Sequence, residues 1–322
     1  MLKNSVLASR HNRRLLVRRK SEVLFTYIFL ILLMLLASCL SEIFLSPRNL
    51  RNLVPANVGI LLVTYGQLFM ILLGGVDLSV GAVISLVNVI CATQMTAEPS
   101  SWMLPIIISV LVSLAIGLFN GLLITKGNQQ PIIATLATQT LFAGVALWVL
   151  DGPGGALPSK LCKFFSKGFD YFVPVAVVLL ASLMMWLVLN RSAIGRNILA
   201  VGGSAQSAEA TGIDVERTKI AACLMCSLMA CLGGLYISFY ATSGNPIIGE
   251  SYTQRSITAA VVGGAALAGG KGSVIGCIAA ALILGIINNV LNLQGVSSYY
   301  QYVMQGAILI AALSLNALKR RK

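Results

Sequence analysis

Charged residues and histidine are scarce in this sequence. Of 322 residues only 10% are charged, and His11 is the only histidine. An ordinary globular domain carries about 25% charged residues, so this chain does not have the surface of a soluble enzyme, a disordered scaffold or a collagen-like rod. Because the one histidine lies in a basic N-terminal segment, histidine relays and zinc-protease helices are excluded as well.

Cysteine is present, but its pattern predicts neither disulfides nor a metal site. The seven cysteines are an odd number, and most of them lie within apolar segments, where cysteine behaves as a small hydrophobic residue. Cys223 and Cys226 form a CxxC pair, but no second cluster of cysteine or histidine lies near them in the sequence. We therefore expect no metal site and no cofactor bound by this chain.

A phosphate-binding loop and a catalytic constellation are also missing. Segment 264–271 is superficially similar to such a loop, but Gly270 follows Gly269 at the position where the motif requires lysine. Any ATP that drives this protein must therefore be bound by another chain. No nucleophile or acid–base pair indicates catalysis, so we expect a protein that is not an enzyme.

Long apolar segments dominate the chain instead. It is 57% hydrophobic with a mean hydropathy of +0.87. Apolar runs of about 18 residues recur along it, long enough to cross a hydrocarbon layer of about 30 Å as helices. We predict an all-α, polytopic transmembrane bundle of about ten spans, in which a basic tail over residues 1–20 precedes one transmembrane domain over residues 21–322. The predicted spans are Val23–Leu45, Ala56–Leu73, Val80–Met95, Trp102–Thr125, Pro131–Leu150, Tyr171–Asn190, Lys219–Tyr240, Ser256–Gly270, Ser273–Leu293 and Tyr299–Leu318.

The positive charge of the chain is concentrated near its two ends. The formal net charge is +13, and basic clusters precede the first apolar run and follow the last. When the 23 basic residues are assigned to the loops of a ten-span topology, most fall on the side of the termini, and Arg255 is among those on the other side. The positive-inside rule then predicts that both termini are cytoplasmic. Basic residues placed in this way indicate contact with anionic lipid headgroups rather than with nucleic acid.

Two glycine-rich segments adjoin the two shortest predicted spans. Segments 74–81 and 263–270 share the pattern Gly-Gly-x-x-Leu-small-x-Gly. Broken helices at matching places in two halves often flank a transport pathway, because irregular backbone at membrane depth must line water or be buried in protein. Chance recurrence of glycine and alanine is the alternative. The candidate residues at the breaks are Gly75, Asp77, Ser79, Gly81, Gly263, Gly264 and Gly270.

Polar side chains within apolar spans are candidates for the solute pathway. Uncharged amides suit hydroxyl-rich solutes, and hydrogen bonding between helices is the alternative role for each of them. Asn288 and Asn292 are four residues apart and therefore share a helix face. Asp77 is the one carboxylate embedded between spans, and it either caps the following helix or binds an ion or proton. The pathway candidates are Asn57, Asn88, Asn120, Asn288 and Asn292.

The longest predicted inner connection is Arg191–Arg217. Within it, Ser204 is expected to cap a short helix over Ala205–Thr211, and Gly212 to end that helix in a left-handed conformation. A helix of about seven residues is not stable alone and must rest on a partner, on the bundle or on the membrane surface. We predict that it is a short cytoplasmic coupling helix. The candidate coupling residues are Gly202, Gly203, Ser204, Ala205, Ala208, Glu209 and Gly212.

Several ordered motifs resemble those of a known family. Their positions are Gly75–Gly81, Ala134–Leu136, Gly195-Arg196, Ala200–Gly203, Gly212-Ile213, Ala259–Gly264, Leu267–Gly272, Asn288-Asn289 and Gly295–Gln301. In these motifs the chain resembles the sugar permeases of bacterial ATP-binding-cassette (ABC) importers of the ribose-transporter type, over nearly its whole length beyond the tail. It departs from the family at Ser204, where asparagine is usual, and at Ala265, where threonine is frequent.

The resemblance implies a permease subunit in the bacterial inner membrane that forms the pathway for a monosaccharide such as a ribose-like pentose. It implies three protein partners: a cytoplasmic subunit that binds ATP and Mg²⁺, an extracytoplasmic sugar-binding protein, and a second permease subunit, identical or different. Two other classes stay open from the residues alone. An ion-coupled secondary transporter would rely on Asp77, and an intramembrane enzyme would need a reactive constellation.

Overall fold

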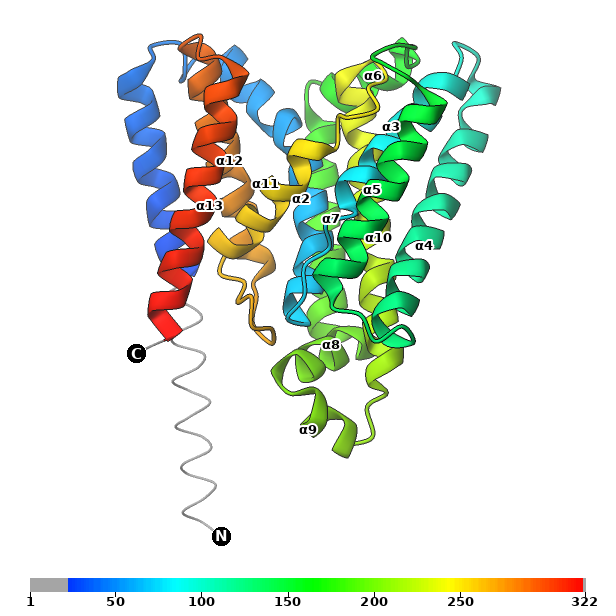
Figure 1. Cartoon of the computed structure of the whole chain (residues 1–322). Helices are drawn as coiled ribbons and strands as arrows, with labels where there is room; N and C mark the ends of the chain where they lie inside the picture. The colour runs from blue at the N-terminus through cyan, green and yellow to red at the C-terminus, as the bar shows by residue number, and fades with distance from the viewer. Residues whose placement is uncertain (1–22, 321–322) are drawn as a thin grey trace.

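The chain forms a bundle of helices, which confirms the predicted all-α class (Figure 1). The computed structural model describes residues 23–320, so the predicted basic tail over residues 1–20 lies outside the described residues. Between residues 23 and 320 no strand forms beyond a single bridge between Gly154 and Gly244. The helices are a first helix at Val23–Leu40, α2 Pro47–Leu72, α3 Val80–Gln94, η1 Pro99–Ser101, α4 Met103–Thr125, α5 Pro131–Val149, α6 Ser159–Lys167, α7 Phe172–Arg191, α8 Ala193–Gly203, α9 Ala205–Ala210, α10 Val215–Ala241, α11 Glu250–Val262, α12 Val274–Leu293 and α13 Ser298–Arg320.

Seven of the described helices are long and apolar enough to cross a membrane: the first helix, α2, α4 together with η1, α5, α7, α10 and α12. The other three predicted spans correspond to α3, α11 and α13. With 15 and 13 residues, α3 and α11 are about 22 and 20 Å long, and neither alone crosses a layer of about 30 Å. The number of ten spans therefore stays a prediction.

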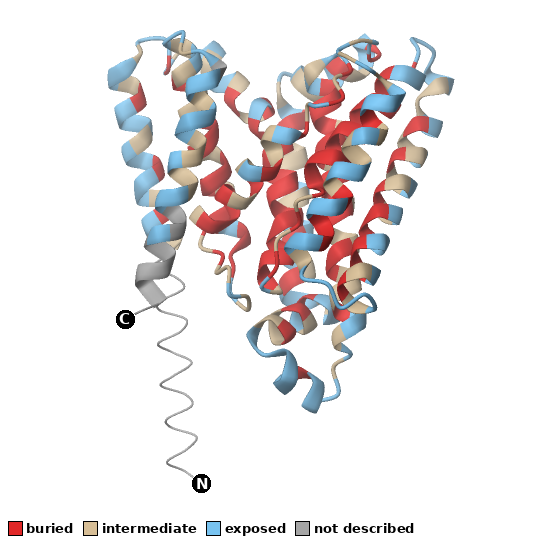
Figure 2. Cartoon of the chain, viewed as in Figure 1, coloured by how far each residue is buried: buried red, intermediate tan, exposed pale blue. Residues whose placement is uncertain are grey.

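Helices α2 and α10 occupy the centre of the bundle. In the most apolar 18-residue stretch of α2, 89% of the residues are buried. In the corresponding stretch of α7, at the periphery, 22% are buried. The two central helices approach each other closely at glycines: a Cβ on Gly66 of α2 would lie 2.7 Å from the carbonyl oxygen of Cys226 in α10. Close packing of this kind holds membrane helices together, because lipid supplies no hydrophobic driving force between them. Figure 2 shows buried residues concentrated along these inner helices.

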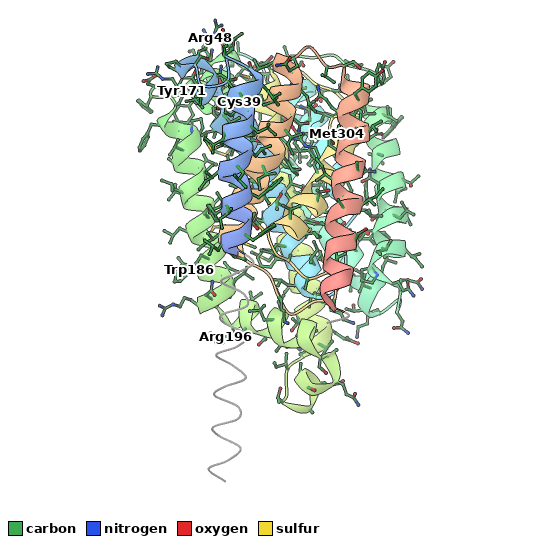
Figure 3. The ribbon with its side chains drawn as sticks, turned by 90° about the vertical axis from the view of Figure 1, so that its left-hand side faces the viewer. Cys39, Arg48, Tyr171, Trp186, Arg196 and Met304 are labelled. Carbon is green, nitrogen blue, oxygen red and sulfur yellow. The ribbon has the colours of Figure 1, made fainter. Side chains whose placement is uncertain are left out.

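Large apolar side chains cover the outside of the bundle. Leu104 on α4, Trp148 on α5 and Leu180 on α7 are more than 60% exposed, and many similar side chains surround them. In Figure 3, Cys39 of the first helix and Met304 of α13 mark another such outer face. Exposed apolar surface on this scale is incompatible with water and indicates a surface that faces lipid or a partner.

Two parts of the chain run through the bundle as an extended segment followed by a short helix, and we call each of them an interrupted span. We call the two ends of the bundle the α6 end and the α9 end (Figure 1). After α2 reaches the α9 end, residues 73–79 turn back into the bundle, and α3 continues to the α6 end. After α10 reaches the α6 end, residues 242–249 turn back in the opposite direction, and α11 continues toward the α9 end. The two interrupted spans therefore run antiparallel, and only the first interruption is one of the two predicted breaks.

Candidate functional site

The segment before α3 is held by its own side chains. Asp77 and Ser79 are completely buried. The Ser79 amide and hydroxyl both donate to Oδ1 of Asp77, at 2.8 and 2.6 Å. Helix α3 begins at Val80 with Ser79 in the N-cap position, so Asp77 lies two residues before the cap, but its carboxylate satisfies the Ser79 amide at the break, as the capping interpretation requires. The Asp77 side chain thus closes a local turn with the residue two positions on, and this turn fixes the extended backbone immediately before α3.

Side chains of α4 and α5 form hydrogen bonds with this segment and with the first turn of α3. The amides of Leu78 and Ala82 donate to the side chains of Thr135 and Gln139 on α5, at 3.0 and 2.9 Å. Asn120 of α4 donates to the Ser79 hydroxyl at 2.8 Å. These contacts satisfy backbone amides that have no partner within the helix and that lipid could not satisfy. Gln67 of α2 completes the arrangement, because in its favourable orientation its amide group bonds both backbone groups of Asp77.

Asn88 of α3 holds the second extended segment. Its amide donates to the Ser238 hydroxyl at 3.0 Å and to the Ser243 carbonyl at 3.2 Å, and it accepts from the Asn245 amide at 2.6 Å. Three elements are therefore joined by one buried side chain. The sequence did contain a signal for this turn, since Ser243–Pro246 reads Ser-Gly-Asn-Pro, but it was not among the predicted breaks.

The two short helices meet at their N-termini. A Cβ on Gly81 of α3 would overlap the hydroxyl of Thr253 in α11 and lie 2.8 Å from the carbonyl oxygen of Gly249. The Gly249 amide donates to the Ser85 hydroxyl at 3.1 Å. Only glycine permits this approach, so the predicted break residue Gly81 lies where the two interrupted spans cross.

The five asparagines predicted for the pathway are not brought together. Asn88 and Asn120 are fully buried near α3, and Thr138 donates to the Asn120 oxygen at 2.8 Å. Asn57 of α2 is buried against Gly285 of α12. The remaining two, Asn288 and Asn292, do share one face of α12. There they accept from Gln305 and Gln301 of α13 at 3.2 and 2.7 Å. Their role in the pathway stays a prediction.

Three segments that are far apart in the sequence meet in one contact, which we call the glycine junction: Leu72, Gly74, Gly202, Gly269 and Gly270. The Gly270 amide donates to the Leu72 carbonyl at 2.8 Å. A Cβ on Gly202 would overlap that same carbonyl oxygen, and one on Gly269 would lie 2.6 Å from the Gly202 carbonyl oxygen. Gly74 and Gly269 also have positive φ angles of 80° and 89°. The end of α2, the end of α8 and the loop before α12 are therefore in backbone contact.

The glycine junction changes the interpretation of the two predicted breaks. The first break precedes α3, whereas the second, with Gly263 and Gly264, follows α11. They therefore do not occupy matching places in two halves. They pack against each other at the α9 end, where the predicted coupling glycines Gly202 and Gly203 also lie.

Helix α9 forms as predicted in the connection between α7 and α10, whereas α8, which precedes it there, was not predicted. The Ser204 hydroxyl accepts from the Ser207 amide at 3.2 Å, so it caps α9, which ends one residue before the predicted limit. Gly212 follows with a φ of 85°. Ala208 is buried, whereas Ala205 and Glu209 are exposed. Ala208 therefore contacts its own chain, and the surface that α9 offers to a partner carries Ala205 and Glu209.

Helix α11 carries Arg255 in a stretch of polar residues that lies before the predicted span Ser256–Gly270. Arg255 was assigned to an outer loop, but it lies in the middle of α11. Glu250 and Gln254 are exposed on the same helix, and Arg255 is half-buried. The polar sequence Glu-Ser-Tyr-Thr-Gln-Arg-Ser over residues 250–256 does not resemble a membrane span, so hydropathy alone started the span too late.

Comparisons with known proteins identify the family. Residues 51–313 match the family described as branched-chain amino acid transport system, permease component. The chain is 37% identical to the ribose import permease of Bacillus subtilis (strain 168), with 91% of this chain and 92% of that one covered. It is 32% identical to the D-allose transport system permease of Escherichia coli (strain K12), with 91% and 90% covered. It is 33% identical to the L-arabinose permease of the same organism, with 81% and 80% covered.

No solved structure matches the chain. The family match covers most of the chain and includes both short helices, the glycine junction and the α8–α9 connection. Together with seven helices suited to crossing a membrane, it makes this an integral membrane protein and a transport subunit rather than an enzyme. The chain thus belongs to the family of permease components of the branched-chain amino acid transport system type.

Proposed function

We propose that this chain is the permease subunit of an ABC importer in a bacterial inner membrane, and that it forms the pathway for a monosaccharide, a ribose-like pentose or a related sugar. Family membership supports the role of permease. The names of the relatives, which are permeases for ribose, allose and arabinose, support a sugar.

The glycine junction is the observation that supports coupling to a separate ATPase. In this proposal a cytoplasmic subunit binds ATP and Mg²⁺ and contacts the exposed side of α9. Because Gly202 at the end of α8 has no free space against Leu72, a displacement of α8 and α9 must move the end of α2 and the loop before α12 as well. Both breaks at the α9 end are thereby linked to one cytoplasmic surface. Such a link transmits energy only if ATP binding favours one of two arrangements of these segments.

The proposed orientation places the α9 end and both termini in the cytoplasm. The sugar-binding protein then docks at the α6 end, and a second permease subunit, identical or different, shares the membrane with this one. The exposed apolar faces of α4, α5 and α7 contact lipid, and nucleic acid has no part. Reporter fusions at the two termini test the orientation: activity on the cytoplasmic side at both ends is expected, and opposite sidedness contradicts it.

An ion-coupled secondary transporter is the second candidate, and one observation favours it. Asp77 is completely buried, and it forms no ion pair with any described residue. A carboxyl group in such a position is a possible proton or ion site.

Uptake into proteoliposomes separates the two mechanisms. The chain is purified from its native membranes with the proteins that accompany it, which are identified, and the complex is reconstituted. We expect uptake of radiolabelled D-ribose that requires ATP on the α9 side and the sugar-binding protein. Uptake that is driven by a proton or sodium gradient in vesicles lacking the ATPase contradicts the proposal and supports the second candidate.

A further inference from the structure

Three polar side chains in the first half of α11 form no hydrogen bond or ion pair with a described residue. Glu250 and Gln254 are exposed, and neither side chain forms a hydrogen bond with a described residue. Arg255 forms no ion pair within residues 23–320, and its buried Nε has no hydrogen-bond acceptor. Its guanidinium carbon lies 5.3 Å from the centre of the Tyr252 ring, which holds the group by a cation–π contact and leaves its N–H groups free.

These side chains lie deep in the bundle. Thr253 packs on Gly81 near the start of α3, and the 13 residues from there to the end of α3 span about 20 Å. The first half of α11 is therefore well inside a hydrocarbon layer of about 30 Å. Helical side chains point toward the helix N-terminus, so Arg255 extends over Tyr252 toward the middle of the membrane and not toward the nearer surface.

A charged group at this depth is not tolerated against lipid. It must face either other protein or a water-filled route, because in lipid the desolvation of an arginine side chain is not compensated. Glu250 has a local reason for its position, since a carboxylate in the first turn of a helix is stabilised by the helix dipole. No such local interaction stabilises the charge of Arg255, and its N–H groups lack an oxygen acceptor.

We propose that the first half of α11 is the solute-binding wall of the pathway, and that Arg255 binds an oxygen acceptor of a polyhydroxylated solute. Hydroxyl groups of a neutral sugar and the carboxylate of a sugar acid offer the same acceptor chemistry to a guanidinium group. Glu250 and Gln254 are four residues apart and share the adjacent face of α11, where they add further acceptors and a donor beside Arg255. This inference rests on the proposed transport function and names the residues that meet the solute.

Accessibility to a water-soluble reagent tests the first part independently of transport. In a Cys39→Ser background, which removes the exposed native cysteine, Gln254→Cys is treated with a charged methanethiosulfonate in the reconstituted complex. Leu180→Cys on the outer face of α7 is the matched control for an exposed but lipid-facing position. We expect rapid modification at residue 254, none at residue 180, and slower modification at 254 when D-ribose or D-ribonate is supplied with ATP and the binding protein.

Uptake kinetics test the role of Arg255 itself. Arg255→Met keeps the length of the side chain but removes every donor, and a hydrogen bond to a charged group corresponds to a change of about ten- to a hundredfold. We expect the KM for the transported sugar to rise by that factor, with assembly and basal ATP hydrolysis unchanged and partial rescue by Arg255→Lys. Arg217→Met removes an exposed arginine at the start of α10 and is expected to leave KM unchanged. Measuring D-ribose and D-ribonate in parallel shows which acceptor the solute provides.

Four results overturn the inference. The first is that residue 254 resists the reagent as residue 180 does, and the second is that neither sugar slows its modification. The third is that Arg255→Met leaves the KM for the transported sugar unchanged. The fourth is oxidative crosslinking of Gln254→Cys between two copies of the chain, which would place this face in a subunit contact. If neither sugar is taken up, the proposed substrate class fails, but the accessibility and protection of residue 254 still decide whether α11 lines the route.

Discussion

Asp77 is the residue whose role the structure narrows to two possibilities, an acceptor for Ser79 or an ionisable group. Its Oδ1 accepts two hydrogen bonds from Ser79, and the thiol of Cys226 lies beside its carboxyl group. The group is thus part of a turn that holds an extended segment inside the bundle. A structural role requires the acceptor at Oδ1, whereas binding of a proton or ion requires the ionisable carboxyl group.

Two substitutions at Asp77 separate these roles. Asp77→Asn keeps the acceptor, so we expect stability and ATP-dependent uptake close to those of the native chain. Asp77→Leu leaves the N–H and O–H donors of Ser79 without an acceptor, at a cost of about 1–3 kcal/mol for each buried group. The melting temperature of the detergent-solubilised protein and D-ribose uptake report the two effects. Loss of uptake in a well-assembled Asp77→Asn protein would indicate an ionisable role.

Gly202 and Gly203 are adjacent glycines with opposite surroundings. A Cβ on Gly202 would overlap the carbonyl oxygen of Leu72, whereas one on Gly203 meets nothing within 4 Å. We expect Gly202→Ala to force α8 away from the glycine junction, at a cost of about 1–3 kcal/mol, and to reduce uptake about tenfold or more relative to ATP hydrolysis. Gly203→Ala is the matched control and is expected to have no effect. Equal behaviour of the two variants would mean that the contact at Gly202 does not carry coupling.

At the scale of elements, the interrupted spans show why polar residues are retained in an apolar bundle. An extended segment exposes amides and carbonyls that lipid cannot satisfy, so neighbouring helices must supply partners. Thr135 of α5 does this for the segment before α3, Gln139 does it for the first turn of α3, and Asn88 of α3 does it for residues 242–249. Polar side chains that look like pathway residues in the sequence thus include several that hold backbone.

The face shared by Asn288 and Asn292 on α12 can be tested as an element. In the proposed pathway role, replacing both with leucine lowers D-ribose uptake while assembly and ATPase binding are retained. Their partners Gln301 and Gln305 on α13 provide the control, because replacing these with leucine breaks the same two hydrogen bonds from the other side. An equal loss of uptake in both double variants would assign the asparagines to helix packing instead.

At the scale of the whole molecule, α9 is the part of the connection between α7 and α10 that is best placed to meet an ATPase in the proposed orientation. It lies beyond the end of the bundle in Figure 1, and Glu209 is exposed on it while Ala208 is buried against its own chain. We expect Glu209→Cys to crosslink to the ATPase subunit in an active complex. Ala208→Cys, one residue away, is expected not to crosslink, because its side chain points inward. Absence of a crosslink from residue 209 in an assembled complex would remove α9 from the coupling role.

Much of this protein follows from its sequence alone. Apolar runs of a length that spans a membrane predict the helical bundle, and seven of the described helices confirm them. Ser204 and Gly212 mark the ends of α9 because capping and left-handed conformations are local properties of a few residues. The family resemblance rests on motifs of the same local kind, and the family match confirms it.

Other features were decided only by tertiary structure. Hydropathy misplaced Arg255, because a short helix packed inside the bundle does not need an apolar sequence on the side that faces away from lipid. The contact of Gly202 with Leu72 and Gly270 joins positions between about 70 and 200 residues apart. Such a contact depends on the way the helices pack, because a glycine has no side chain from which its partner can be inferred. The sequence thus determines which long segments form helices, whereas packing determines which breaks touch and which polar groups are left without a partner.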